Sequence, residues 1–558
     1  MNLQGILATY QAGRLEEAER AISAYLARHP DDDQAQQLGA LIAQKRGDLA
    51  TAYTRIQAAL TKPGNIHEKL NTRGNILKAL RADIEAQASF EAALEAYPDY
   101  DVARTNLATL LLQTGQPDRA AGEFAKLGTA DRNRDLIARG HVQSLIEANR
   151  PLEALEILKT ANLSDAQAAV LKARAYFHLG RFEDVVALCA DVIDDGEHGA
   201  ESLKLSLQTL AMTGEWDTKA TPLIEDVCAR YPESDRLHAQ ALTALQRVGD
   251  LELADAIYAR ASKGPAVLSA RAVRMVAEGD YAEAERLASA ALSQQRAYPT
   301  AMYQLCFASL GLGKYDQAQA VADIALQSDP HEQFYWAIKA TAGRAKGQDY
   351  RYYFDYDRFV RPYDIEAPQG WSSVEAFNAD LKAELDALHG FTAEPIDQTL
   401  RLGTQTSPNL VHVDSPAIRG FFETVRPAIA DYLARIGRDP NHAFLRRNTG
   451  NFRIRSGWSV RLSGGGHHIN HIHPDGWISS AYYVDVPEGA GKEGWIKFGE
   501  PPAPLNAALG QGPELDVQPK AGRLVLFPSY LWHGTYPIVG EATRMTLPID
   551  ILPAAPAP

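Results

Sequence analysis

The sequence predicts a multidomain α + β protein, with an N-terminal all-α array of repeats followed by a strand-rich domain with flanking helices. Two observations predict this division. A unit of about 34 residues recurs through the N-terminal half, and short β-branched and aromatic segments separated by Gly and Pro dominate the sequence from about residue 451. A third observation, a group of histidines in the strand-rich part, indicates that the second domain binds a metal.

The amino-acid composition limits the kinds of molecule that this protein is expected to bind. The chain has 558 residues, enough for several domains, and a formal net charge of −14 at pH 7. This charge argues against nucleic acid or an anionic membrane as a general partner. The sequence has no apolar run long enough to span a membrane, and its first residues lack the features of a secretion signal. Its three cysteines fit buried thiols in a reducing compartment, so we expect a cytoplasmic protein.

The recurring unit begins with a glycine, or a residue in its place, and has a small residue five or six positions later. Six of the nine steps between successive units are 34 residues, and the others are 31, 35 and 30. Pro30, Pro63, Pro98, Pro232 and Pro330 come about where units end. The ten pairs are Gly13/Ala18, Gly47/Ala52, Arg81/Ala86, Gly115/Ala120, Asn149/Ala154, Gly180/Val185, Gly214/Ala220, Gly249/Ala254, Gly279/Ala284 and Gly313/Ala318.

Each position of the unit has a physical role. Glycine allows a positive φ in a turn between two helices, the small residue lets those helices approach closely, and proline ends the second helix. This pattern resembles the tetratricopeptide repeat, a helix–turn–helix unit of 34 residues. The resemblance implies about ten repeats forming a superhelix over residues 1–346, with a concave face that holds a protein or peptide partner.

The repeat rhythm weakens after Pro330, and we place a domain boundary near residue 347. Residues 347–450 are predicted to be a helical and mixed lead-in, with helices at Val374–Leu388 and, singly or as a pair, at Pro416–Ile436. Residues 451–558 are predicted to be a core of short strands, for which a double-stranded β-helix, or jelly roll, fits the spacing. The expected strands are Trp458–Leu462, Ile478–Val484, Trp495–Phe498, Arg523–Pro528 and Met545–Ile551.

The candidate metal ligands are concentrated in one short stretch. His471 and His473 are two residues apart, so on a strand they point the same way, and Asp475 follows two positions later. His533 and Arg544 come after a later strand-like segment. Two histidines and a carboxylate are the ligands of the facial triad that holds Fe(II) with open coordination positions.

Four segments carry a resemblance to a known family: Leu400–Thr406, Trp458–Leu462, His471–Val484 and Gly522–Thr535. Together they resemble the Fe(II)/2-oxoglutarate-dependent oxygenases, and more narrowly bacterial oxygenases often fused to tetratricopeptide repeats. The resemblance implies Fe(II) as metal, 2-oxoglutarate as co-substrate and O₂ as oxidant. It also implies that Arg544 binds the distal carboxylate of 2-oxoglutarate, that Thr546 adds a hydroxyl contact, and that Tyr483 or Tyr482 adds another.

The residues leave two ligand sets open. His473, Asp475 and His533 form the usual triad. His471, His473 and His533 form an all-nitrogen site, in which Asp475 would accept a hydrogen bond from an imidazole. The other histidines of this half are expected to form hydrogen bonds in loops; they are His412, His442, His467 and His468.

The resemblance implies a dioxygenase that hydroxylates a protein or peptide side chain presented by the repeats. Two other functions stay open. One is an all-histidine iron dioxygenase that does not use 2-oxoglutarate. The other is a repeat scaffold whose jelly roll binds metal without catalysis.

Overall fold

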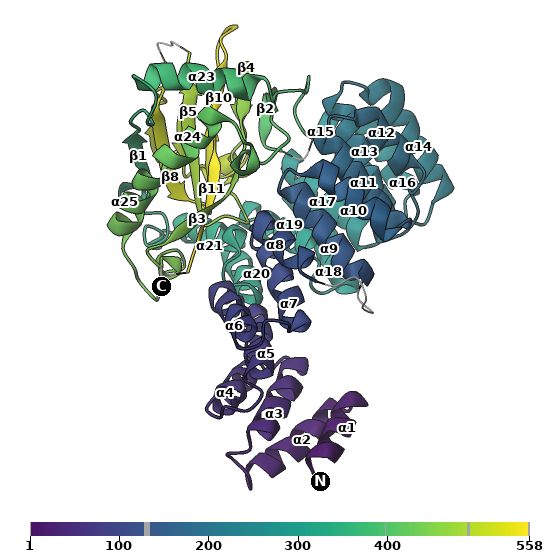
Figure 1. Ribbon diagram of the computed structural model, residues 1–558. Helices are drawn as coiled ribbons and strands as arrows, with labels where there is room; N and C mark the ends of the chain where they lie inside the picture. Colours follow the sequence, from purple (N-terminus) through teal and green to yellow (C-terminus); the bar gives the residue numbers. More distant parts are fainter. Residues whose placement is uncertain (1, 128–133, 397, 488–490, 556–558) are drawn as a thin grey trace. The chain divides into compact units, whose positions relative to one another are not determined.

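The structure is a computed structural model that describes residues 2–127, 134–396, 398–487 and 491–555. The ends of the two predicted domains, Met1 and residues 556–558, therefore lie outside the described residues. The chain forms two compact units, Met1–Asn162 and Leu163–Pro558. Helices form the first unit and the first part of the second, and strands dominate the rest (Figure 1).

In the described residues of the first unit, 2–127 and 134–162, ten helices are arranged in helix–turn–helix pairs. Successive helices contact each other along the whole series. Their bounds are α1 Leu3–Gln11, α2 Leu15–Leu26, α3 Asp33–Lys45, α4 Leu49–Ala59, α5 Ile66–Ala79, α6 Asp83–Ala96, α7 Asp101–Gln113, α8 Pro117–Ala125, α9 Arg134–Glu147 and α10 Pro151–Ala161.

The predicted repeat positions are confirmed at all ten turns of the two units. Every predicted turn residue has a positive φ, including the non-glycine residues Arg81 at 59° and Asn149 at 56°. The ten small partner residues, from Ala18 to Ala318, are all 0% exposed. The left-handed turn and the close helix contact therefore coincide at every repeat, as the 34-residue pattern requires.

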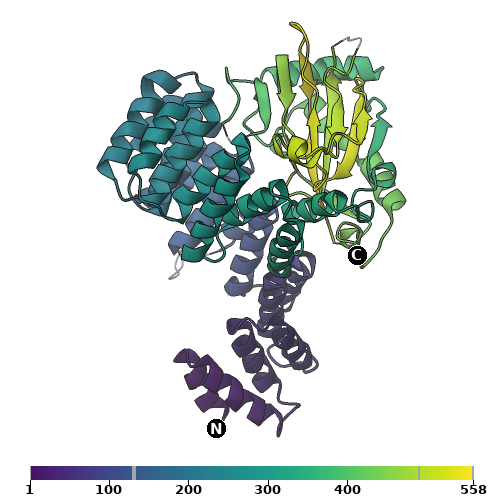
Figure 2. The same cartoon turned by 180° about the vertical axis from the view of Figure 1, so that it is seen from behind.

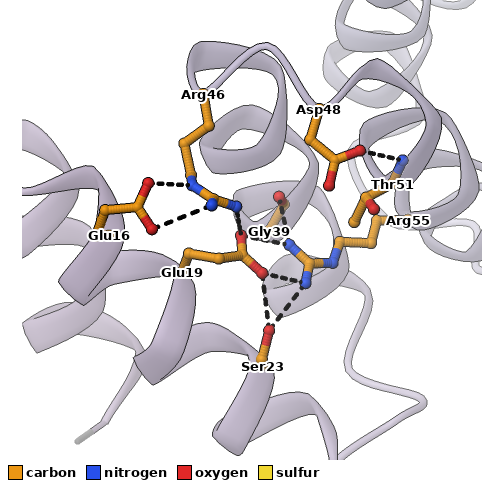
Figure 3. A network of polar contacts seen from close by, with 8 residues as sticks. All are labelled: Glu16, Glu19, Ser23, Gly39, Arg46, Asp48, Thr51 and Arg55. Atoms are coloured by element: carbon orange, nitrogen blue, oxygen red, sulfur yellow. Dashed lines mark hydrogen bonds and ion pairs between the residues drawn. The ribbon is translucent and has the colours of Figure 1, made fainter.

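Ion pairs join the first repeats across their helices. The guanidinium of Arg55 on α4 donates to the Glu19 carboxylate on α2 at 2.6 and 2.9 Å and to the Gly39 carbonyl on α3 at 3.0 Å (Figure 3). Arg46 pairs with Glu16 at 3.0 Å in the same network. One side chain thus connects three consecutive helices, because the fork of donors on arginine reaches several acceptors at once.

The second unit continues the helical pairs before its strands begin. Its repeat helices are α11 Ala166–His178, α12 Phe182–Ala190, α13 Glu197–Met212, α14 Thr221–Arg230, α15 Asp235–Val248, α16 Leu251–Arg260, α17 Pro265–Glu278, α18 Tyr281–Gln294, α19 Pro299–Gly311, α20 Tyr315–Ser328 and α21 Gln333–Ala345. A π-helical turn, η1 Trp216–Ala220, precedes α14. It lies where the Gly214/Ala220 pair has its extra residue, since a π turn accommodates one residue more than an α turn.

Two sheets form the strand-rich part. Its strands are β1 Arg361–Asp364, β2 Leu400–Gln405, β3 Phe452–Gly457, β4 Val460–His468, β5 Ile478–Asp485, β6 Ile496–Phe498, β7 Leu515–Val517, β8 Arg523–Pro528, β9 His533–Thr535, β10 Arg544–Thr546 and β11 Ile549–Pro553. An antiparallel sheet has the order β1-β8-β5-β10-β4-β2, with β11 paired to β3 and β5, and a smaller sheet has the order β7-β6-β9. Closure of these sheets into a jelly roll stays a prediction.

Helices cover one face of the larger sheet. The covering helices include α23 Val374–Asp386, α24 Pro416–Thr424 and α25 Arg426–Ile436. The short helices of this part of the chain are α22 Tyr356–Phe359, α26 Leu505–Leu509, and the 3-10 turns η2 Leu410–His412 and η3 Leu445–Arg447. Figure 1 shows α24 in front of the strands, and Figure 2, seen from behind, shows the strands nearer the viewer. The predicted helices at 374–388 and 416–436 are thereby confirmed, the second as a pair.

The strand-rich part shares its core with the last repeats. One continuous cluster of buried residues includes Ile338 of α21, Leu526 of β8 and Ile551 of β11. The indole of Trp532 donates to the Thr341 hydroxyl of α21 at 2.8 Å, and Arg344 donates to the Gly499 carbonyl at 2.7 Å. The boundary predicted near residue 347 therefore falls within one compact unit, and its position stays a prediction.

Three sequence expectations differ from the structure in detail. The strand expected at Trp458–Leu462 begins only at Val460 and extends to His468. The strand expected at Met545–Ile551 is divided into β10 and β11. Pro548 lies at this break, and its lack of a backbone N–H prevents an unbroken ladder. Gly347, with φ of 69°, continues the series of turn residues beyond the ten predicted.

Among the described residues, the structure contains no helix with both the length and the apolar composition needed to cross a lipid bilayer.

Candidate metal centre

A backbone bridge brings the first two candidate ligands together. His471 and His533 form an isolated antiparallel bridge, in which each N–H donates to the other residue's carbonyl, at 2.8 and 3.0 Å. Residues directly opposite each other in such a bridge project to the same side. Their ring centroids are 4.2 Å apart.

His473 joins the pair from the same segment. Its backbone N–H donates to the Ser529 carbonyl at 3.0 Å. Its ring centroid lies 5.2 Å from that of His471 and 5.1 Å from that of His533. One nitrogen from each of the three rings lies within 4.8 Å of the others, an arrangement that could hold a metal ion. The segment is not a regular strand, but the two histidines face the same way as the i, i+2 spacing predicts.

Hydrogen bonds fix which nitrogen each ring offers. The Nδ1 atoms of His471 and His533 lie 2.7 and 2.8 Å from the carbonyls of Ile469 and Leu531, and Nδ1 of His473 lies 2.8 Å from an Asp550 carboxylate oxygen. Carbonyl and carboxylate oxygens only accept, so Nδ1 carries the hydrogen in all three rings. This leaves Nε2 as the nitrogen whose lone pair can bind a metal.

Burial keeps the imidazoles of His471 and His533 neutral. Burial, together with the neighbouring histidines, lowers the pKa of His471 to about 3 and the pKa of His533 well below its ordinary value. A neutral imidazole is the form that binds metal, so no proton has to leave these two rings at neutral pH. Aromatic rings enclose the site: Phe527 lies 4.6 Å from His533 and Trp458 lies 5.8 Å from His473, centroid to centroid.

The structure does not bring Asp475 into this group. Its side chain is 79% exposed, with a carboxylate oxygen 3.9 Å from Nη1 of Arg455. The chain turns directly after His473, where the Gly476 N–H donates back to the His473 carbonyl at 3.2 Å. This turn directs Asp475 to solvent, so of the two predicted ligand sets the geometry assembles His471, His473 and His533.

Asp550 is the carboxylate that contacts the group, and sequence reasoning missed it. It lies on β11 and accepts hydrogen bonds from His473 and, at 2.8 Å, from the Ser479 hydroxyl. Burial raises its pKa, but His473, Ser479 and Arg455 outweigh this effect and lower the pKa below its ordinary value. Its signal in the sequence is a lone carboxylate in the apolar run from Leu547 to Leu552.

Arg544 is a buried cation with incomplete hydrogen bonding. It is 2% exposed, its Nη1 donates to the Gly494 carbonyl, and its Nε has no partner. Burial lowers its pKa. Tyr483 lies beside it, with its ring centroid 5.8 Å from the guanidinium carbon, and its buried hydroxyl also lacks a partner. Two unsatisfied donors at one buried place indicate room for an acceptor, since such groups are costly without one.

The remaining predicted contacts lie around Arg544. Thr546 is buried on the same strand, two residues on, and directly opposite Tyr483 of β5. Tyr482 projects to the other face, where its hydroxyl donates to Asn378 of α23 at 2.7 Å. Tyr483 is therefore the tyrosine that faces Arg544.

His468 connects the two groups electrostatically. Burial lowers its pKa well below the ordinary value, and His471, Arg544 and His473 lower it further. Its Nδ1 lies 3.2 Å from the Thr399 hydroxyl. His442 lies in a loop and forms a hydrogen bond to the Tyr352 carbonyl, as predicted. The loop prediction is wrong for His467 and His468, which lie on β4, where Nδ1 of His467 is 3.1 Å from the Gly465 carbonyl.

Family models match both parts of the chain. A model described as "Putative 2OG-Fe(II) oxygenase" matches residues 456–550, which contain the three histidines, Arg544 and Asp550. A tetratricopeptide repeat model matches residues 84–140 and 275–342. The predicted fusion of tetratricopeptide repeats to a domain of this oxygenase type is thereby confirmed. No curated protein matches the chain.

Several solved repeat proteins are similar to parts of the chain. A tetratricopeptide repeat protein from Parabacteroides merdae is 14% identical, covering 50% of this chain and 98% of its own, with a TM-score of 0.32. The C-terminal part of a repeat protein from Cytophaga hutchinsonii is 12% identical, covering 55% and 99%, with a TM-score of 0.31. The Pseudomonas aeruginosa protein pilF is 21% identical, covering 42% and 92%, with a TM-score of 0.29. Scores this low carry no argument about this chain.

Proposed function

We propose that this chain is an Fe(II)- and 2-oxoglutarate-dependent dioxygenase that hydroxylates a protein or peptide side chain presented by its repeats. The observation that carries the proposal is a pair of neighbouring features. Three imidazoles, of which only that of His533 is fully buried, converge with Nε2 available, and the buried guanidinium of Arg544 lacks a full set of acceptors. Each feature fits one component of such a reaction, and the family match at residues 456–550 supports combining them.

The three histidines would hold the metal. Imidazole is a suitable ligand for iron, and the hydrogen bond that each Nδ1 donates fixes the orientation of its ring. Bound Fe(II) with 2-oxoglutarate and O₂ would supply the oxidative chemistry, in which one oxygen atom enters a C–H bond and the other enters succinate as CO₂ is lost. The surrounding aromatic rings, Trp458, Phe498 and Phe527, would keep water from the site.

Arg544 and Tyr483 would hold the co-substrate. A guanidinium binds a carboxylate through two parallel hydrogen bonds, which would use the unsatisfied nitrogen of Arg544 and compensate its buried charge. The Tyr483 hydroxyl, also unsatisfied, would donate to the same carboxylate. Burial raises the pKa of Tyr483 to about 12, so this hydroxyl keeps its proton at neutral pH. Thr546 would add a contact from the same face.

The repeats would bring the substrate. Their last helices share a core with the metal domain, and Trp532, which bonds α21, directly precedes the ligand His533. A partner held by the repeats of the second unit would therefore lie against the same compact unit as the metal centre. This supports a macromolecular substrate, since tetratricopeptide arrays hold peptides and proteins on a concave face.

The decisive experiment separates binding from turnover. Anaerobic protein is mixed with Fe(II) and 2-oxoglutarate, and we expect a visible absorption band that requires both. Partners captured by the full chain are then supplied with O₂, and we expect succinate and a gain of one oxygen atom in the partner by mass spectrometry. The band should be absent in Arg544→Met. A protein that binds metal but gives neither band nor succinate would be a metal-containing scaffold, which contradicts the proposal.

One observation favours a second candidate. Because the geometry assembles three histidines without Asp475, an iron dioxygenase that does not use 2-oxoglutarate is also consistent with the ligand set. In that enzyme Arg544 would bind a substrate carboxylate. Oxygen consumption with a partner but without 2-oxoglutarate would support this candidate and exclude the first.

A further inference from the structure

The Asp550 carboxylate is buried directly behind one candidate metal ligand. It accepts from His473 Nδ1 at 2.8 Å and from the Ser479 hydroxyl at 2.8 Å, and Ser479 in turn lies 2.8 Å from the Ser529 hydroxyl. A buried ionised carboxylate is costly unless hydrogen bonds compensate it. The hydrogen bonds from His473 and Ser479 therefore stabilise a negative charge on Asp550.

The strand register builds this arrangement. Asp550 of β11 lies directly opposite Ser479 of β5, so their side chains share one face of the sheet. Ser529 completes the connection, since its carbonyl also accepts the backbone N–H of His473. The side chain and the main chain of His473 are thus both tied to the same small network.

The charge of the proposed ligand set suggests a role for the Asp550 carboxylate. Three neutral imidazoles leave the full double positive charge of Fe(II) in a buried site, whereas a two-histidine, one-carboxylate set reduces it by one. Asp475 cannot make up this difference effectively, because its exposed charge is screened by solvent. Asp550 is enclosed, and only one imidazole separates it from the metal position.

We propose that Asp550 is a positioning residue that supplies, through the His473 imidazole, the negative charge that the three-histidine ligand set lacks. This assignment rests on the proposed metal centre and goes beyond it, because it names where the carboxylate of the usual triad has its counterpart. The hydrogen bond holds His473 in the tautomer that directs Nε2 to the metal. The same bond makes the imidazole a more basic ligand and stabilises the more positively charged metal.

Substitutions of Asp550 separate the effect of its charge on the metal from its effect on the orientation of the His473 imidazole. Asp550→Asn keeps an oxygen that can accept from Nδ1 but removes the charge, Asp550→Ala removes both, and Asp550→Glu keeps a charge. The matched control is Asp364→Asn, which removes a carboxylate from β1 of the same sheet, where it pairs with Lys520 and Arg523 rather than with a histidine. The full chain is titrated with Co(II) and Fe(II), and the Fe(III)/Fe(II) midpoint potential is measured.

We expect Asp550→Asn to weaken metal binding 10- to 100-fold and to shift the midpoint potential to more positive values. Asp550→Ala should bind metal more weakly still, Asp550→Glu should recover the potential in part, and Asp364→Asn should match the wild type in both measurements. A purely structural role would not shift the potential. If Asp550→Asn fails to fold, Ser479→Ala provides the test, with metal binding expected to fall several-fold.

Two outcomes would contradict the role assigned to Asp550 alone, and a third would contradict the proposed function as well. Wild-type affinity and potential in Asp550→Asn, or equal losses in Asp550→Asn and Asp364→Asn, would overturn this assignment alone. A wild-type chain that binds neither Fe(II) nor Co(II) would overturn the proposed function as well.

Discussion

His471 and His533 exchange both of their backbone hydrogen bonds, and this bridge holds their imidazoles with centroids 4.2 Å apart. The main chain, rather than a metal, therefore sets the distance between two candidate ligands. Ligands that the main chain holds in place in this way lose less conformational freedom when a metal binds.

The histidine ligand set can be tested by four alanine substitutions. His471→Ala, His473→Ala and His533→Ala should each abolish tight Fe(II) or Co(II) binding, because each removes one of three ligands. Asp475→Ala should change the dissociation constant by less than about twofold, since the exposed carboxylate is outside the group. Metal content after equilibrium dialysis measures both. Loss of metal in Asp475→Ala with retention in His471→Ala would instead establish the triad of His473, Asp475 and His533.

Arg544→Met should separate co-substrate binding from stability. The substitution should abolish 2-oxoglutarate binding measured by calorimetry in the Fe(II)-loaded protein. Without ligand, the free energy of unfolding of the second unit should stay the same or rise by roughly 1–3 kcal/mol, because an unsatisfied buried donor is removed. Tyr483→Phe should bind 2-oxoglutarate more weakly without losing it. A large loss of stability in Arg544→Met would show that the guanidinium is structural.

Glu332→Gln should stabilise the protein in a pH-dependent way. Burial, with a smaller contribution from the charges of Asp329 and Asp475, raises the Glu332 pKa from 4.5 to about 7. Between these two values the folded state binds more protons than the unfolded state, so the wild type loses stability as pH rises from 4.5 to 7. The cost above pH 7 is at most about 3 kcal/mol and is reduced by partial exposure.

The Gln variant should therefore match the wild type near pH 4 and exceed it at pH 8. Urea unfolding at both pH values measures the difference. Gln also keeps an acceptor for the Phe334 N–H, which Glu332 accepts at 3.2 Å, so the helix cap is retained. An advantage of the same size at both pH values would contradict the assigned ionisation.

Two glycines of the first unit should respond in opposite directions to alanine. Gly47 has φ of 82°, and a Cβ there would meet nothing within 4 Å, so Gly47→Ala should destabilise by about 1–2 kcal/mol through backbone strain alone. Gly122 within α8 is equally open and has no positive φ, so Gly122→Ala should stabilise by about 0.5–1 kcal/mol. Thermal unfolding followed by circular dichroism compares them. Equal effects would mean that turn conformation does not determine the sequence pattern.

The repeat array could be predicted in detail because its rule is local. A turn residue and a small residue five or six positions later are enough, and the rule holds even where Arg81 and Asn149 replace glycine. Gly347 was missed because the position five residues on is Tyr352, so the second half of the pattern is absent. The turn persists there although no full helical pair follows it.

The candidate site could be predicted only in part, because its final geometry is non-local. Spacing singled out the three histidines as candidates, and the family resemblance added Arg544. It could not choose between Asp475 and His471, because a single turn after His473 decides which of them faces the site. Asp550 reaches His473 through strand pairing with β5, which no short motif encodes. Likewise, alternation places Tyr482 and Tyr483 on opposite faces, and only the packing of α23 shows which face is which.

The hydrogen bond between Trp532 and Thr341 restricts which repeat arrays can be combined with the strand-rich part of this protein. The indole of Trp532, the residue directly before His533, donates to an acceptor on the last repeat helix, and both side chains are almost fully buried. A strand-rich part moved onto a different scaffold would leave this indole without its acceptor beside His533, a candidate metal ligand. Recombination, natural or engineered, should therefore preserve α21 with the strands it supports, while repeats farther toward the N-terminus are free to change in number and specificity.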